Sequence, residues 1–243
     1  SMHAYFLKTI DQDVDVVYSV TVLRVGKSST TQLVTAQQDG HPVCIVIASF
    51  TKLRVDESPC RERPMPHVPA PEGLMTDAEY YLTVKNDTRC PDSLGKLYEF
   101  NAWAAQNENP VEIRPVLVFD DLQAFGPAPK REVEYPKFTN EPKHMFWMKC
   151  KQDLPDDPSE HIKAMGVISD LGLLITAKGP NSTKKPPAMM ASLDHTIWFH
   201  AEFRADDWLL FDLESPCAKN ERGLAFGRVY NRNGELVVSL GQE

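Results

Sequence analysis

The sequence has no excess of positive charge and no long apolar run. Its 243 residues include 26 lysines and arginines against 34 aspartates and glutamates, a formal net charge of -8. Proteins that bind nucleic acids by neutralising phosphates usually carry a basic excess, so we expect no nucleic-acid partner. No apolar run approaches the roughly 18 residues that a membrane-spanning helix needs, so we expect no membrane span.

Several motifs of catalysis and metal binding are also absent. The chain has no Gly-x-Ser-x-Gly elbow, no His-Glu-x-x-His and no dinucleotide-binding glycine fingerprint. Its 5 cysteines are scattered without a Cys-x-x-Cys pair, which favours a reducing compartment, although a disulfide between Cys60 and Cys90 stays open. The histidines at 161, 195 and 200 form no set at metal spacing. We therefore expect neither a metal nor a cofactor.

Two copies of one β-hairpin unit are the clearest pattern present. Each copy opens with a short aromatic strand and centres on a turn, Asp39-Gly40 in the first and Asn233-Gly234 in the second. The turn glycines lie 194 positions apart (234 minus 40). A repeat of this length predicts two similar domains rather than a solenoid. The expected strands are 3–7, 16–25, 32–36 and 43–50 in one copy, and 193–200, 208–213, 224–230 and 235–240 in the other.

A long helix is predicted ahead of the second aromatic strand. Apolar residues recur at spacings of three and four from Ser159 to about Ala177, and Gly179-Pro180 would end the helix. Because its apolar residues lie on nearly all sides, we expect the helix to be buried and wrapped by sheet. A further strand is expected at 144–150.

The first copy starts at residue 1 with its aromatic strand, so we expect its own helix to lie upstream of this chain. The one candidate substitute is a helix at 93–105. The pattern predicts an α+β fold, a tandem hotdog in which antiparallel sheets each wrap a long helix, with the first helix absent here. The expected domains are 1–55, a truncated first hotdog, and 110–243, the second hotdog, joined by a linker or insertion at 56–109.

Three polar residues stand out in apolar surroundings. Asp170 shares a helix face with Val167 and Leu174, so it is either a buried carboxylate that needs partners or part of an exposed strip. Gln242 continues the core-facing positions 236, 238 and 240, or lies at a frayed end.

Ser192 is the third of these residues. Strand alternation places it with Asp194, Thr196 and Trp198 on one face, and places His195 on the other face. Several hydroxyl and carboxyl groups would then converge on one side of the strand. The alternative is that these groups only satisfy backbone donors at a strand edge.

Longer stretches resemble a known family. The runs SLDHTIWFH at 192–200 and FRADDWLL at 203–210 closely resemble the acyl-CoA thioesterase II family. Ser169-Asp170-Leu171, Gln242-Glu243 and, in the first copy, residues 3–7 and 48–50 match it as well. The first of these runs is the most specific.

The resemblance implies a double-hotdog enzyme that hydrolyses fatty acyl-CoA thioesters to free fatty acid and CoA, without a cofactor. The family's catalytic aspartate, threonine or serine, and glutamine fall on Asp170, Ser192 and Gln242. Together they would hold a water molecule, with Asp170 accepting its proton. Acyl-CoA is then the expected partner, with further homo-oligomerisation open. The peroxisomal matrix is the compartment implied by eukaryotic relatives, and the cytoplasm is the alternative.

The chain departs from the family pattern in three places. The glycine-glycine-glutamine segment and helix of the first hotdog, which would contribute to the acyl groove and the oxyanion site, are missing. Relatives usually carry Ser-Phe and an arginine where this chain has Ser28-Ser29 and Gln32. The chain also ends at Glu243, before the family's last strand residues and any peroxisomal address. Activity is therefore expected of the complete protein rather than of this chain alone.

Two other functions stay open. One is a non-catalytic double-hotdog module that binds acyl-CoA or serves in assembly. The other is a hydratase or dehydratase on the same fold, which requires a catalytic histidine near the helix; only His161 could serve.

Overall fold

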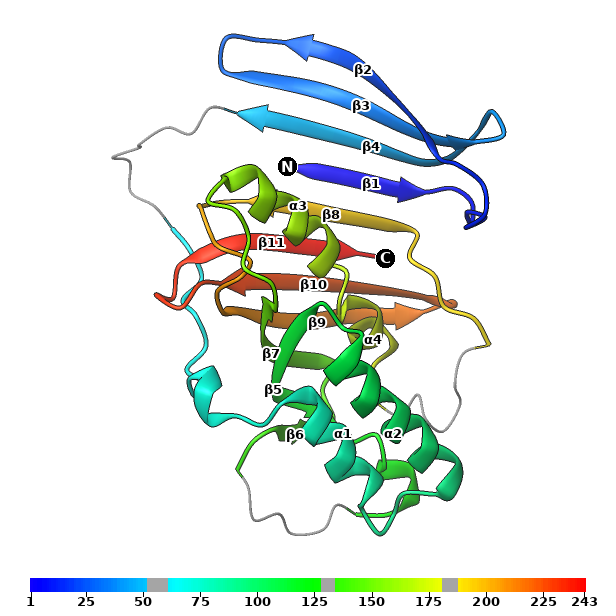
Figure 1. Cartoon of the computed structure of the whole chain (residues 1–243), viewed down its shortest axis with the longest axis vertical. Helices are drawn as coiled ribbons and strands as arrows, with labels where there is room; N and C mark the ends of the chain where they lie inside the picture. The colour runs from blue at the N-terminus through cyan, green and yellow to red at the C-terminus, as the bar shows by residue number, and fades with distance from the viewer. Residues whose placement is uncertain (52–60, 128–133, 181–187) are drawn as a thin grey trace.

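A computed structural model describes residues 1–51, 61–127, 134–180 and 188–243. Within these residues the chain forms one sheet of 11 strands (Figure 1). Neighbouring strands are antiparallel except for β5 and β6. In spatial order the strands are β2 (Val17–Val25), β3 (Ser29–Gln38), β4 (His41–Thr51), β1 (Met2–Phe6), β8 (Asp194–Phe199), β11 (Leu236–Gln242), β10 (Arg222–Tyr230), β9 (Leu209–Lys219), β7 (Lys143–Cys150), β5 (Val111–Phe119) and β6 (Lys137–Thr139).

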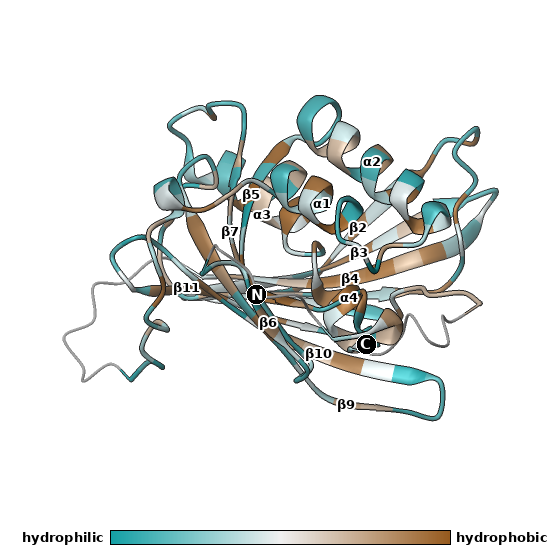
Figure 2. Cartoon of the chain, turned by 90° about the horizontal axis from the view of Figure 1, so that it is seen from below, coloured by the Kyte–Doolittle hydropathy of each residue, from teal (hydrophilic) through white to brown (hydrophobic). Residues whose placement is uncertain are grey.

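Four helices lie on one side of this sheet in the described part of the chain (Figure 2). None of them is long and apolar enough to cross a membrane. The helices are α1 (Asp77–Lys85), α2 (Asp92–Asn107), α3 (Pro158–Ile168) and α4 (Leu173–Lys178), and two short 3-10 turns are η1 (Pro71–Gly73) and η2 (Gln123–Phe125).

The strand order confirms the internal repeat. In the first copy the spatial order is β2-β3-β4-β1, and in the second the same connectivity gives β9-β10-β11-β8. The two copies meet where β1 pairs with β8, with Ala4 opposite His195. One sheet therefore runs through both copies, and the domain limits at residues 55 and 109 stay a prediction.

The two turns of the repeat differ in detail. Asp39 and Gly40 both have positive φ, 49° and 75°, as the type I′ turn favoured by an Asp-Gly pair requires. In the second copy Gly234 has a φ of 85°. There the side chain of Asn231 organises a wider turn, because its Oδ1 accepts hydrogen bonds from the backbone N–H groups of residues 233 and 235.

The single helix expected from Ser159 to Ala177 is broken into α3 and α4. Gly172, between them, has a φ of 92°, a conformation that glycine adopts without steric cost. The backbone here passes very close to the sheet: a Cβ at this position would lie 2.9 Å from Leu213 Cδ1 and 2.9 Å from Phe146 Cε1. The break is thus set by the packing of the glycine on β7 and β9.

Only one side of the α3–α4 pair is buried. Met165, Ile168 and Leu173 pack into the main core, with exposed fractions of 2% or less. Val167 and Ile175 on the other side are 69% and 53% exposed, so the expectation of a helix buried all round is wrong.

The segment between the copies covers both faces of the sheet at one end. Residues 61–75 cross the face opposite the helices, where the indole N–H of Trp147 donates to the carbonyl of Pro69 at 3.0 Å. The helix expected at 93–105 is present within α2. With α1 it packs beside β5, far from β2–β4 (Figure 1), so it does not replace a helix of the first copy. Cys90 is a free thiol, and Cys60 lies outside the described residues.

Replacing Gly172 by alanine should destabilise the fold by about 2 to 4 kcal/mol, since the new methyl group needs a left-handed backbone and overlaps core side chains. Gly166 in α3 is the matched control, because a Cβ there would meet nothing within 4 Å. Gly166→Ala should stabilise the protein by about 0.5 to 1 kcal/mol. Urea unfolding of both variants checks this, and equal midpoints for Gly172→Ala and the wild type would contradict it.

Candidate active site

The three residues expected to be catalytic come from three elements. Ser192 lies just before β8, Gln242 is the last residue of β11, and Asp170 lies in the joint between α3 and α4. The structure brings two of them together: Gln242 Nε2 donates to Ser192 Oγ at 2.5 Å. Gln242 is 3% exposed, which confirms that it faces the core rather than a frayed end.

A histidine that the sequence analysis placed on the opposite strand face joins this pair. His195 is 4% exposed, and its Nδ1 lies 2.7 Å from Gln242 Oε1. On the other edge of the ring, Nε2 lies 2.8 Å from the hydroxyl of Ser169, which is fully buried. Four side chains, listed from strand end to helix joint, thus form one hydrogen-bonded series: Ser192, Gln242, His195 and Ser169.

With the Gln242 amide oriented so that Nε2 faces Ser192, each hydrogen bond of the series has one direction. An amide oxygen only accepts, so His195 Nδ1 must carry the hydrogen that Gln242 Oε1 receives. In the neutral imidazole Nε2 is then the acceptor, and the Ser169 hydroxyl donates to it. At the other end, Ser192 Oγ accepts from Gln242. The Ser192 hydroxyl hydrogen therefore remains available for another acceptor.

Asp170 directly follows Ser169 but does not join the series. Its side chain is exposed, and within the described residues it makes no hydrogen bond or ion pair. Of the two alternatives left open by the sequence, the structure favours the exposed strip over the buried carboxylate. The catalytic role of Asp170 stays a prediction.

The end of β11 is held beside the start of β8 by its last residue. The backbone of Glu243 accepts from Leu193 N at 2.7 Å and donates to Asp194 Oδ1 at 2.8 Å. The side chain of Arg222 forms a double hydrogen bond with the Glu243 carboxylate, and this contact lowers the pKa of Glu243. These contacts keep Ser192 next to Gln242.

The predicted strand alternation is wrong at Ser192. Because β8 begins only at Asp194, the residues before it are not bound to the alternating pattern, and Ser192 turns toward the same glutamine as His195. Asp194 instead accepts from the backbone at the chain's last residue. The expected convergence of Ser192 with Asp194 is therefore replaced by convergence on Gln242.

His161, the histidine that a hydratase would require, is hydrogen-bonded to the backbone. His161 is 4% exposed, and its Nδ1 accepts from the backbone N–H of Ala205 at 3.1 Å. Its Nε2 has no hydrogen-bond partner among the described residues. The ring lies at the start of α3, outside the series formed by Ser169, His195 and Gln242.

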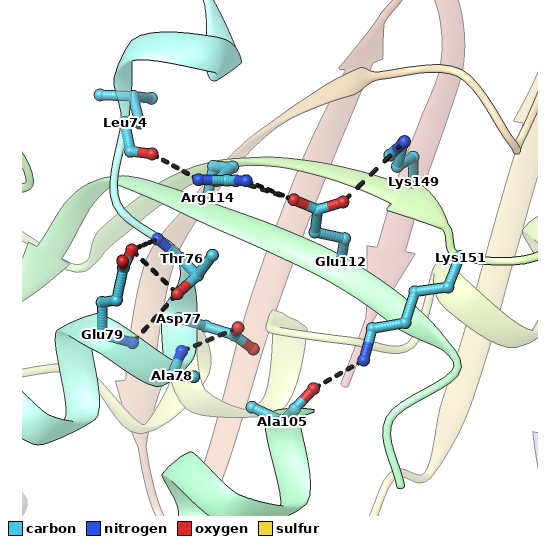
Figure 3. A network of polar contacts seen from close by, with 10 residues as sticks. All are labelled: Leu74, Thr76, Asp77, Ala78, Glu79, Ala105, Glu112, Arg114, Lys149 and Lys151. Carbon is cyan, nitrogen blue, oxygen red and sulfur yellow. Dashed lines mark hydrogen bonds and ion pairs between the residues drawn. The ribbon is translucent and has the colours of Figure 1, made fainter. Parts of the chain in front are cut away.

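A cavity of about 530 Å³ lies beside the helix joint, between the α1–α2 hairpin, β5, β7 and α4. Polar contacts fix the hairpin that forms its outer wall (Figure 3). Arg114 Nη1 on β5 donates to the carbonyl of Leu74 at 2.6 Å, and Lys151 Nζ donates to the carbonyl of Ala105 at 2.7 Å. At the start of α1, Thr76 and Glu79 form a reciprocal capping box.

Burial shifts the pKa values of groups that line this cavity. It lowers the pKa of His144 to about 4, so the ring is neutral at physiological pH and bonds to Thr176 Oγ1 at 3.2 Å. Burial also raises the pKa of Asp121 and raises that of Tyr81 to about 12. The cavity thus combines an apolar floor with a few polar groups.

Comparison with known proteins identifies the family. Residues 131–243 match the acyl-CoA thioesterase family, and residues 1–51 match the N-terminal domain of acyl-CoA thioesterases. Human acyl-coenzyme A thioesterase 8 is 36% identical over 249 residues, covering all of this chain and 71% of the human protein. The chain belongs to the acyl-CoA thioesterase II family.

Other relatives extend this result to bacteria. Acyl-CoA thioesterase 2 of Haemophilus influenzae is 30% identical over 247 residues, with 77% of its length covered. The solved acyl-CoA thioesterase II TesB2 from Mycobacterium marinum is 30% identical, with a TM-score of 0.71 over 99% of this chain and 77% of that one. A hot-dog-fold protein of Alicyclobacillus acidocaldarius, 16% identical with a TM-score of 0.63, shares the fold. The expected double-hotdog fold and membership of a thioesterase family are confirmed.

The lowered pKa of the half-buried His144 should make stability depend on pH. Its pKa is about 4 in the folded chain against about 6.5 when unfolded, so the unfolded state gains a proton first as pH falls. The free energy of unfolding should therefore decrease by up to about 3 kcal/mol between pH 6.5 and pH 4. His144→Gln should remove this dependence, measured by urea unfolding at a series of pH values.

The contribution of His144 is the difference between the pH dependence of the wild type and that of His144→Gln. The raised pKa of Asp121 acts with the opposite sign, because a raised carboxyl pKa favours the folded state as pH falls, but it is present in both proteins. His67 is exposed, so His67→Gln serves as the control and should keep the wild-type slope. Identical slopes for His144→Gln and the wild type would contradict the prediction.

Proposed function

We propose that the protein hydrolyses fatty acyl-CoA thioesters with a water molecule held by Asp170, Ser192 and Gln242. The observation that carries the proposal is the buried Gln242 amide, which donates to the Ser192 hydroxyl at 2.5 Å. Membership of the acyl-CoA thioesterase II family supports the reaction class. The assignment of the catalytic group itself rests on the resemblance and on this contact.

In the proposed reaction the water oxygen attacks the thioester carbonyl carbon while Asp170 accepts the proton that the water loses. The tetrahedral intermediate collapses by breaking the carbon–sulfur bond, and the proton passes to the departing CoA thiolate. The products are a carboxylic acid and the CoA thiol. The Ser192 hydroxyl hydrogen, not used by Gln242, is available to the carbonyl oxygen or the water.

The joint between α3 and α4 supplies the position of the carboxylate. Ser169 is tied to His195 by its hydroxyl and to Met165 by its backbone N–H, so the backbone before Asp170 is fixed. The carboxylate itself is exposed and makes no hydrogen bond within the described residues. Substrate would have to approach this exposed side of the joint for the three groups to act together.

A non-catalytic acyl-CoA-binding module is the second candidate. The absence of a described contact between Asp170 and the Ser192–Gln242 pair is the observation that keeps it in consideration. A binding module would retain affinity for acyl-CoA without releasing thiol. A thiol-release assay on the full-length protein with short, medium and long acyl-CoAs separates the two functions.

Asp170→Asn should lower kcat by at least about 10²-fold and leave KM for acyl-CoA nearly unchanged, because the amide cannot accept the proton but keeps the shape of the side chain. Asp153→Asn is the matched control, an exposed aspartate outside the site, and should keep wild-type activity. Thiol release by the full-length protein measures both.

Two results would overturn the proposal. If the full-length protein binds acyl-CoA but releases no thiol from any chain length, the binding module is the better assignment. If thiol is released equally by the wild type and Asp170→Asn, the reaction stands but Asp170 is not its base.

We also propose a peroxisomal location, the compartment that the family resemblance implies for eukaryotic relatives; mouse acyl-coenzyme A thioesterase 8 is 37% identical to this chain. Imaging of the tagged full-length protein tests this, and a diffuse cytoplasmic signal would contradict it. Homo-oligomerisation stays a prediction, to be checked by light scattering.

A further inference from the structure

We propose that His195 is a positioning residue whose Nδ1–H sets the orientation of the Gln242 amide, and through it the role of the Ser192 hydroxyl. The inference rests on the proposed function, since it concerns how the Ser192–Gln242 pair is held. Its basis is the pair of contacts that the ring makes: Nδ1 to Gln242 Oε1 at 2.7 Å and Nε2 to Ser169 Oγ at 2.8 Å.

The orientation of a glutamine amide needs such a constraint. Rotation by half a turn about the last side-chain bond exchanges oxygen and nitrogen with little change in shape. With the oxygen toward Ser192, the serine would have to donate its hydrogen to the glutamine. With the nitrogen toward Ser192, as observed, the serine accepts and its hydrogen is free. Only the observed orientation leaves the hydroxyl able to donate to a reacting oxygen.

The imidazole holds this orientation through the tautomer with hydrogen on Nδ1, in which the Ser169 hydroxyl donates to Nε2. The ring is 4% exposed and Ser169 is fully buried, so neither finds water as an alternative partner. Ser169 also donates its backbone N–H to Met165 within the last turn of α3. The single His195 ring thus links Ser169, at the end of α3, to Gln242, at the end of β11. Figure 1 shows α3 crossing β8 and β11.

The ring's two nitrogen atoms can be tested separately. An asparagine side chain places its N–H₂ near the Nδ1 position and so retains a donor for Gln242 Oε1. A glutamine side chain is one methylene longer and places its polar atoms near the Nε2 position, which retains the contact with Ser169 and loses the donor to Gln242. The two variants are close in size and polarity, so they differ mainly in which contact survives.

His195→Gln should lower kcat by about 30- to 100-fold with KM nearly unchanged, the size of effect expected when a reacting group is misoriented rather than removed. His195→Asn should recover kcat to within about 5-fold of the wild type. Thiol release by the full-length protein gives both constants, and thermal unfolding measures whether the two variants are equally stable. Equal kcat for the two variants would overturn the inference, and so would a loss that follows their melting temperatures.

A double variant tests whether His195 acts through Gln242. If it does, His195→Gln combined with Gln242→Ala should be no slower than Gln242→Ala alone, because the amide to be oriented is already gone. If instead the kcat losses of the two single variants multiply in the double variant, the inference is overturned.

The proposed function is tested separately. If Asp170→Asn and Gln242→Ala both retain wild-type kcat, the assignment of the catalytic group is wrong. If both are slow while His195→Gln is not, only the positioning role fails.

Discussion

The buried contact between the His195 ring and the Gln242 amide is the interaction on which the geometry of the site depends. A buried polar group left without a partner costs about 1 to 3 kcal/mol. Ser169, His195 and Gln242 are all buried, so each must stay bonded to the next. This series of hydrogen bonds thereby joins the end of α3 to the last strand of the chain.

The close approach of helix to sheet makes this contact possible. Gly172 lets the backbone turn away from α3 with a φ of 92°, and its missing side chain leaves room for Leu213 and Phe146. A continuous helix through residues 158–178 would need a negative φ at Gly172, so the chain could not change direction there. The joint that carries Ser169 and Asp170 is therefore a product of core packing on β7 and β9, not of helix propensity.

Much of the fold could be predicted from the sequence, because hairpins and repeats are local patterns. Asp39-Gly40 predicted the first turn, and the repeat predicted two similar copies, which share one strand connectivity in the structure. Gln242 was placed correctly by its period-two spacing from Leu240. His195 was missed as a partner, because alternation was extended past the start of β8 to Ser192. Contacts among a loop, a helix end and the last strand have no local signature.

The Asp170 carboxylate is exposed while the hydrogen-bonding groups beside it are buried, and this difference has a simple physical cause. Neutral amide, imidazole and hydroxyl groups can be buried when their hydrogen bonds are satisfied, and burial then holds them rigidly. An unpaired carboxylate can be buried only at a much higher cost, and Asp170 accordingly lies at the surface while its neighbour Ser169 is fully buried. The adjacent residues Ser169 and Asp170 thus place a buried, hydrogen-bonded hydroxyl next to a solvent-exposed carboxylate. In the proposed mechanism, this arrangement keeps the directional groups aligned without desolvating the carboxylate before substrate arrives.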